Sequence, residues 1–410
     1  MNPLTNNAAL FFLQLSLILG ACAVMRAMMR RIKQPPVIGE MIAGVLLGPS
    51  LFGLVFPEVA GFVFPSASKP ILYSVASLGL TLYMFVVGLE FRIDLFRERF
   101  RTAITVSSAG IVAPFILGGG IALWLQAQGG FFTSLVSPAI AWLFMGTALS
   151  ITAFPMLARI IRENRLAGTF VGTIALAAGS CDDVIAWMLL AVVLSCLSGN
   201  STLILFAAIG GSLVYVLTCF FVIKPVLKKF QSKIKNESEF FCIVMLLVML
   251  GAYFTDMVGL YSVFGAFILG LTIPRDGTAE KLAEKIDPLT TSVLLPVFFT
   301  YSGLNTKLGL LDSLGLAGIC AVIIAVSIAA KLLACYGAAR MSGINHADAL
   351  TIGSLMNARG LMELILLNIC LQAGIISPTL FTMLVLMAVV TTLMAAPGFL
   401  LAQKLSTKNC

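Results

Sequence analysis

Two adjacent aspartates, Asp182 and Asp183, lie inside an apolar run from residue 167 to 197 that contains no other charged residue. An aspartate at the centre of a membrane helix costs roughly 3 kcal/mol, so two in succession require a function or hydrogen-bond partners. Like charges this close oppose each other's ionisation, and successive helix residues point in different directions. One carboxylate can therefore face a water-filled cavity and the other a partner cation, which would allow a proton to be exchanged for a metal ion.

The composition excludes a soluble globular domain. Of the 410 residues, 60% are hydrophobic and only 11% are charged, and apolar stretches of about 20 residues recur throughout. The nine cysteines show no metal-binding spacing, and one histidine is too few for haem ligation or most nucleophilic sites. We therefore expect an all-α polytopic membrane protein that is not an enzyme and has no cofactor.

The basic residues indicate how the chain is oriented. With the N-terminus outside, nearly all of the 26 Lys and Arg residues fall in the inside connections, and only Lys69 and Lys307 fall outside. This predicts a cytoplasmic C-terminus and explains the net charge of +8 by orientation, so we expect a lipid bilayer and no nucleic acid as partner. The thirteen predicted spans cover about residues 8–27, 36–53, 70–90, 103–127, 138–161, 167–197, 201–223, 239–257, 258–273, 289–306, 314–338, 348–373 and 378–403.

Two of these spans, the fifth and the twelfth, carry small and polar residues where a membrane helix should be apolar. Ser150 and Thr152 lie in the fifth, and Asn357 lies in the twelfth. If the helices are interrupted there, these side chains and the unwound carbonyls can coordinate a small cation beside Asp183. The alternative is that the hydroxyls bond back to their own helices and bend them.

Similar segments in spans of opposite direction predict an inverted repeat. The fifth and twelfth spans are seven spans apart, as are the second and ninth, which both contain paired glycines followed by a proline. Members of each pair therefore cross the membrane in opposite directions, as in many transporters. Close packing of small residues is the alternative explanation.

Four further charged residues in the predicted spans are candidates for a functional role. Lys331 would have to climb most of about 13 Å to reach the interface, so a buried charge partner is favoured over a snorkelling lysine. Arg359 and Glu363 are spaced i, i+4, which favours an internal salt bridge. Glu40 is near the cytoplasmic end of its span, where it either is solvated or lines an inner funnel.

Several segments, in order along the chain, resemble the signatures of the monovalent cation/proton antiporters. They are residues 34–40, 85–90, 148–155, the Asp182-Asp183 pair and residues 298–304. The resemblance runs from about residue 10 to 403 and is to the branch with bacterial sodium/proton and potassium/proton exchangers and plant cation/proton exchangers. It implies exchange of Na+ or K+ for protons by alternating access, in a homodimer in the bacterial plasma membrane. A channel-like potassium efflux system is the alternative, although the sequence has no selectivity motif such as TVGYG.

The family resemblance also implies an architecture. A single membrane domain would cover residues 1–410, and two crossed, broken helices, at residues 138–161 and 348–373, would lie in a core that moves like an elevator. The scaffold would comprise about residues 8–90 and 201–306, and the core about 103–197 and 314–403. Because the chain ends at Cys410, we expect no C-terminal soluble domain.

Roles for individual residues follow from the same resemblance. Asp183 would carry the ion or proton with Asp182 as its neighbour, so that the transported cation is the only metal ion held. Lys331 corresponds to the partner lysine of electrogenic members. A cation that binds both aspartates would displace this lysine, which would then lose its own proton, so that two protons leave for each cation.

Overall fold

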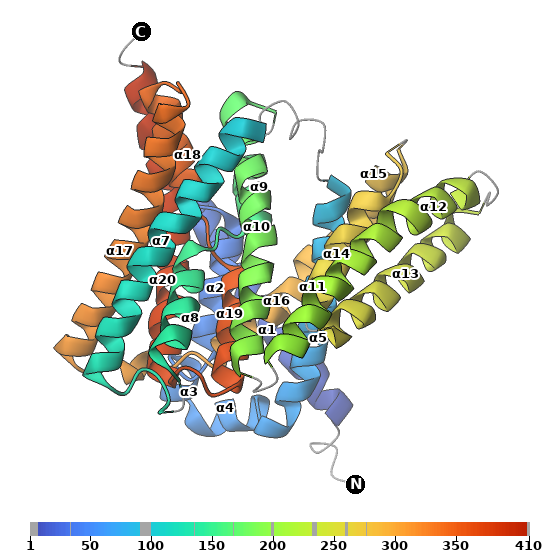
Figure 1. Cartoon of the computed structure of the whole chain (residues 1–410). Coiled ribbons are helices and arrows are strands. Elements are labelled where there is room, and N and C mark those ends of the chain that lie inside the picture. Colours follow the sequence, from blue (N-terminus) through green and yellow to red (C-terminus); the bar gives the residue numbers. More distant parts are fainter. Residues whose placement is uncertain are drawn as a thin grey trace. The chain divides into compact units, whose positions relative to one another are not determined.

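The computed structural model is almost entirely helical (Figure 1). Its described residues contain no β-strand, and one isolated antiparallel bridge joins Phe132 to Ile376. The structure describes residues 7–32, 34–90, 100–134, 136–166, 168–197, 201–231, 236–258, 261–275 and 277–407.

The helices follow one another along the chain with short connections. The first half contains α1 (Asn7–Arg31), α2 (Pro36–Leu47), α3 (Phe52–Val55), α4 (Pro57–Val63), the 3-10 turn η2 (Ser66–Ser68), α5 (Lys69–Glu90), α7 (Phe100–Gln128), α8 (Pro138–Ser150), α9 (Phe154–Glu163) and α10 (Phe170–Leu197). The second half contains α11 (Ser201–Thr218), the π-helical η3 (Cys219–Ile223), α12 (Lys224–Gln231), α13 (Glu237–Met257), α14 (Tyr261–Thr272), α15 (Thr278–Leu289), the π-helical η4 (Thr290–Leu294), α16 (Leu295–Gly303), the 3-10 turn η5 (Leu308–Leu310), α17 (Leu314–Met341), α18 (His346–Leu355), α19 (Leu361–Gln372) and α20 (Pro378–Thr407).

Within the described residues, eight helical stretches are long and apolar enough to cross a membrane. The polytopic all-α class predicted from the sequence is confirmed, and the figure of thirteen spans stays a prediction. The eight stretches are Ala8–Arg31, Pro36–Val55, Pro57–Glu90, Phe100–Gln128, Gly210–Gln231, Glu237–Met257, Leu314–Met341 and Pro378–Phe399, and shorter apolar helices cover Pro138–Ser150 and Ser262–Thr272.

The chain forms two compact units. Unit 1 comprises residues 1–19, 61–92 and 194–301, and unit 2 comprises residues 20–60, 93–193 and 302–410. Every candidate site residue is in unit 2. Residues 20–60 group with unit 2, although the resemblance assigns them to the scaffold. The functional division into scaffold and core stays a prediction.

In unit 1, α5 packs against α14 and α15, and α13 packs against α14. Glycine allows α5 and α14 to approach closely, since a Cβ added to Gly270 would lie 2.5 Å from the Phe85 carbonyl oxygen and 2.9 Å from the Gly88 Cα. Small residues allow membrane helices to approach this closely. Gly270 is one of the glycines in the predicted repeat, and its position is explained by this packing.

In unit 2, three long helices surround two interrupted ones. α7 packs against α8 and α17, while α18 packs against α17 and α20 and α19 contacts α8 and α20. Side-chain caps start both interrupted helices: the Ser137 hydroxyl accepts from the Ile140 N–H before α8, and the Asn345 side chain accepts from the Asp348 N–H before α18. The long helices thus fix the place at which the interruptions meet.

The interruptions predicted in the fifth and twelfth spans are present. We call them break 1 (residues 151–153, between α8 and α9) and break 2 (residues 356–360, between α18 and α19). The Ala153 N–H of break 1 donates to the Ala358 carbonyl of break 2 at 2.9 Å, so each break satisfies part of the other's freed backbone. Break 2 ends at Gly360, whose φ of +149° a residue with a side chain rarely adopts.

Candidate ion-binding site

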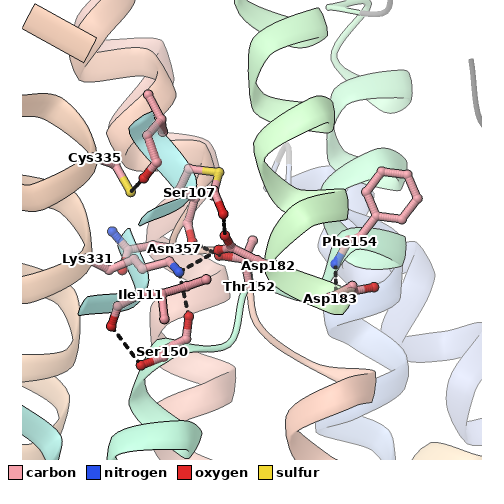
Figure 2. Close-up of polar contacts among 12 residues, drawn as sticks. Ser107, Ile111, Ser150, Thr152, Phe154, Asp182, Asp183, Lys331, Cys335 and Asn357 are labelled. Carbon is pink, nitrogen blue, oxygen red and sulfur yellow. Dashed lines mark hydrogen bonds and ion pairs between the residues drawn. The ribbon is translucent and has the colours of Figure 1, made fainter. Parts of the chain in front are cut away.

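Asp182 lies at the centre of a buried polar cluster on α10 (Figure 2). Its Oδ1 accepts a 2.6 Å hydrogen bond from the Ser107 hydroxyl of α7, and its Oδ2 lies 2.8 Å from the Thr152 hydroxyl of break 1. The Lys331 ammonium of α17 donates to the same Oδ2 at 2.7 Å. Only 1% of Asp182 is exposed. Its carboxylate is therefore both paired with a cation and surrounded by hydrogen-bond donors.

Lys331 also binds the end of an interrupted helix. Its Nζ donates to the backbone carbonyl of Ser150, the last residue of α8, at 2.5 Å. A cation is favourable at this position because the C-terminal end of a helix carries partial negative charge. The lysine side chain is fully buried, so it does not snorkel to the membrane surface. It is ion-paired with Asp182, and its role in transport stays a prediction.

Asp183 points to the other side of α10, away from Asp182 and Lys331 (Figure 2). Its Oδ1 accepts from the backbone N–H of Phe154 at 3.3 Å, at the first turn of α9. A carboxylate is favourable there because the N-terminal end of a helix carries partial positive charge. Its Oδ2 is buried and has no hydrogen-bond donor among the described residues. This oxygen can accept a proton or a cation without first losing a protein partner.

The three residues predicted to support cation binding differ in what they contact. The Thr152 hydroxyl lies within reach of both Asp182 Oδ2 and the Met356 carbonyl, at 2.8 and 3.0 Å, and its one proton can serve one of them at a time. The Ser150 hydroxyl instead lies 2.6 Å from the Gly146 carbonyl of its own helix, as the alternative interpretation predicted, and 3.0 Å from the Ile111 carbonyl of α7, and it donates its one proton to one of them at a time. Ser150 reaches the cluster through its backbone carbonyl.

Asn357 in break 2 is buried but is not hydrogen-bonded to either aspartate. Its Nδ2 donates to the Gly353 carbonyl at 3.4 Å, and its Oδ1 has no donor within the described part of the chain. The amide oxygen is therefore a second buried acceptor that a cation could use.

The remaining predicted charges form two ion pairs. Arg359 lies 3.7 Å from Glu363, and both side chains are fully buried. Arg26 of α1 lies 3.6 Å from Glu40 of α2. Glu40 is fully buried, so it is not the solvated end residue that was one of its two interpretations, while Arg26 is 21% exposed.

Sequence reasoning missed two groups of the site. Ser107 is one of two consecutive serines in a mostly apolar span that also contains Thr105, a weak signal that did not single it out. The Phe154 N–H becomes available only because break 1 frees it, and side-chain chemistry gives no indication of such a backbone donor.

When the buried acidic and basic side chains are matched, one carboxylate has no ion-pair partner among the described residues. Lys331 pairs with Asp182, Arg359 with Glu363 and Arg26 with Glu40. Among the described residues, no Lys or Arg nitrogen lies within salt-bridge distance of Asp183. Asp183 is the buried carboxylate of this cluster that lacks a protein cation.

The sequence matches the family of transmembrane sodium/hydrogen exchangers over residues 16–400. This chain belongs to the sodium/hydrogen exchanger family. Membership confirms the resemblance seen in the signature segments and identifies the chain as a transporter that exchanges a monovalent cation for protons, and not as an enzyme. The channel-like alternative finds no support.

Several relatives extend the comparison. The chain is 38% identical over 402 residues to the Na(+)/H(+) antiporter NhaS4 of Synechocystis sp., covering 96% of this chain and 97% of that protein. It is 36% identical to Cation/H(+) antiporter 20 of Arabidopsis thaliana and 34% identical to K(+)/H(+) antiporter 1 of Saccharomyces cerevisiae, each over 97% of this chain. This exchanger spans 49% and 47% of those two proteins.

A solved structure supports the fold of this exchanger. The sodium proton antiporter MjNhaP1 of Methanocaldococcus jannaschii matches with a TM-score of 0.69 over 97% of this chain and 99% of that one, at 16% sequence identity. At this identity the likeness concerns the fold alone. The arrangement of helices is therefore one that a known antiporter also has.

Proposed function

We propose that this exchanger carries its substrates at Asp183, which binds a proton in one loaded state and a monovalent cation in the other. The observation that supports this most strongly is the pairing of charges. Among the described residues four acids are buried, and three of them, Glu40, Asp182 and Glu363, have a basic nitrogen within 4 Å, whereas Asp183 does not. One proton or one monovalent cation neutralises one carboxylate. A charge left uncompensated in a membrane interior is costly, so the empty site would cross the membrane poorly.

Coupling follows from competition for the same oxygen. Phe154 N–H holds Oδ1 of Asp183, and the partner-free Oδ2 receives the substrate. Because a protonated carboxyl is a poor ligand for a metal ion, binding of the cation requires loss of the proton. Alternating exposure of this site to the two sides of the membrane then exchanges one substrate for the other. In this proposal the core helices, about residues 103–197 and 314–403, carry the site, and the scaffold, about 8–90 and 201–306, stays in place.

Asp182 and Lys331 set how many protons move. Lys331 occupies Asp182 Oδ2, so a cation reaches Asp182 only when the lysine leaves. If the displaced lysine also loses its proton, two protons leave for each cation and transport is electrogenic. The proposed stoichiometry is therefore two protons for each cation.

The cation is proposed to be Na+ or K+, since relatives are named for each. Asn357 Oδ1 is the further ligand best supported by its burial without a donor, and Thr152 and the Ser150 carbonyl lie beside Asp182. We further propose a homodimer in the bacterial plasma membrane with the N-terminus outside, on the basis of the family resemblance and the basic residues of the connections.

The test is ion flux with purified protein in liposomes. A pH-sensitive dye inside the liposomes reports proton movement when Na+, K+ or Li+ is added outside. Exchange predicts proton efflux that depends on the added cation and, when the liposome interior is made acidic beforehand, uptake of labelled cation against its gradient. Cation flux that proceeds at the same rate without any proton movement would refute the proposal.

A further inference from the structure

The C-terminal end of α8 is bound by two protein cations. The Arg359 guanidinium donates from Nη1 to the Ala148 carbonyl at 2.7 Å and from Nη2 to the Leu149 carbonyl at 2.5 Å. The next carbonyl, of Ser150, accepts from Lys331 at 2.5 Å. Three successive carbonyls at the negative end of one half-helix are thus divided between an arginine and a lysine.

Arg359 is fixed at both its backbone and its side chain. Its backbone N–H donates to the Thr392 hydroxyl at 2.9 Å, and that hydroxyl lies 2.8 Å from the Arg359 carbonyl. The guanidinium is a rigid planar fork, so two parallel hydrogen bonds set the direction of both carbonyls that it contacts. Break 2 therefore determines how the end of α8 is oriented.

Glu363 follows Arg359 by one helical turn and lies in the first turn of α19. Its carboxylate is 0% exposed and 3.7 Å from Arg359 Nη1, and among the described residues neither of its oxygens has a hydrogen-bond donor. A buried carboxylate without hydrogen-bond donors lowers the stability of the folded protein. What it provides is a negative charge beside Arg359, which would otherwise be a buried cation bound only to neutral carbonyls.

Resting on the proposed function, we propose that Glu363 is a positioning residue for the ion site, acting through Arg359 on Lys331. Glu363 holds the guanidinium where it binds the Ala148 and Leu149 carbonyls. The Ser150 carbonyl is then the one left for Lys331, and the ammonium bound there faces Asp182 Oδ2. Without the negative charge, Arg359 shifts, the end of α8 turns, and Lys331 loses the geometry in which it pairs with Asp182.

The experiment is a double-mutant cycle between Glu363 and Lys331. Glu363→Gln removes the charge and Glu363→Asp keeps it, and each is made alone and together with Lys331→Gln. Initial exchange rates are measured against cation concentration in liposomes, with and without a clamped membrane potential. Asn368→Ala is the matched control: Asn368 is also buried on α19 but is bonded to Ser302 and the Leu364 carbonyl, outside this chain of contacts.

We expect Glu363→Gln to lower kcat at saturating cation roughly tenfold, since misplacement of a group by about an ångström has effects of this order or larger. Glu363→Asp should restore much of the loss. In the Lys331→Gln background the same change should alter kcat by less than about twofold, because the residue through which it acts is gone. Asn368→Ala should change kcat by the same factor in both backgrounds and leave the voltage dependence unaltered.

The inference is overturned if Glu363→Gln lowers kcat by the same factor in the native and the Lys331→Gln backgrounds. It is also overturned if Asn368→Ala lowers kcat in the native background but not in the Lys331→Gln background. If Glu363→Gln does not fold, as judged by size-exclusion chromatography in detergent, Arg359→Lys replaces it in the cycle, because lysine keeps the charge but not the two-pronged contact. The same two outcomes then decide. Failure of the proposed function is seen separately, as undiminished exchange by Asp183→Asn, a residue outside this chain of contacts.

Discussion

Lys331 lies 2.7 Å from Asp182 with both side chains fully buried. Lys281 lies at the same 2.7 Å from Glu237, but those side chains are 65% and 59% exposed. The two pairs have the same nitrogen–oxygen distance but differ in what the loss of one partner does to stability. Water screens the exposed pair, which contributes little, whereas loss of one partner of the buried pair leaves a charge uncompensated inside the protein.

Asp183→Asn is expected to fold and to abolish exchange. The amide does not titrate and offers no anionic ligand, although its oxygen can still accept from the Phe154 N–H. Size-exclusion chromatography in detergent establishes folding, and dye-loaded liposomes measure exchange. Cation-dependent proton flux at the native rate would remove Asp183 from the site.

The exchange rate is expected to fall at acid pH. Protons and cations compete for the Asp183 carboxylate, so a high proton concentration leaves fewer sites for the cation. Initial rates between about pH 6 and 9, at low and high cation concentration, measure this. High cation should restore the rate at the acid end. A flat profile, or an acid loss that cation does not relieve, would contradict competition at one carboxylate.

Lys331→Gln is expected to weaken the dependence of exchange on membrane voltage while leaving some exchange. The substitution removes one of the two groups proposed to release a proton, and Asp183 can still alternate between proton and cation. The measurement is the initial rate with and without a valinomycin-clamped potential, with Na+ as substrate. Equal voltage dependence in the native and substituted proteins would assign Lys331 a structural role only.

Ser107→Ala is expected to destabilise the protein by about 1 to 3 kcal/mol, because a buried carboxylate loses one of its donors. The hydroxyl donates to Asp182 Oδ1 at 2.6 Å, whereas the neighbouring Ser108 is exposed and serves as the matched control in Ser108→Ala. Thermal unfolding followed by intrinsic fluorescence checks both. A melting temperature that falls equally in the two variants would argue against a specific contribution of the Ser107 hydroxyl.

Glu237→Gln is expected to change neither stability nor exchange measurably near neutral pH. The hydrogen bond to Glu237 raises the pKa of Lys281 above its ordinary value of 10.5. The stabilisation from that shift is fully present below the ordinary pKa and is lost as pH rises through the raised value. Solvent screening keeps it small at every pH, so its loss is hard to detect. Thermal unfolding at about pH 7 and pH 11 tests this, and a large loss at pH 7 would be unexpected.

The sequence alone determined the class of the protein and where its helices are interrupted. Apolar stretches of membrane length are a local property, and so is the presence of Ser150, Thr152 and Asn357 in spans that should be apolar. Two adjacent aspartates are improbable in a membrane helix without a function, so the pair marks the site by its composition alone. The order of the signature segments then predicted the family.

Only the tertiary structure shows which aspartate has no cationic side chain within salt-bridge distance among the described residues. Asp182 and Asp183 are chemically identical and adjacent, and what separates them is that α10 turns one toward Lys331 and Ser107 and the other toward the start of α9. These partners are 29 to 149 residues distant in sequence, so no local pattern contains them. The contact of Arg359 with the end of α8 could not be predicted from the sequence either. The i, i+4 spacing predicts a neighbour on the same helix, but it does not indicate which carbonyls of a second interrupted helix lie beside the guanidinium.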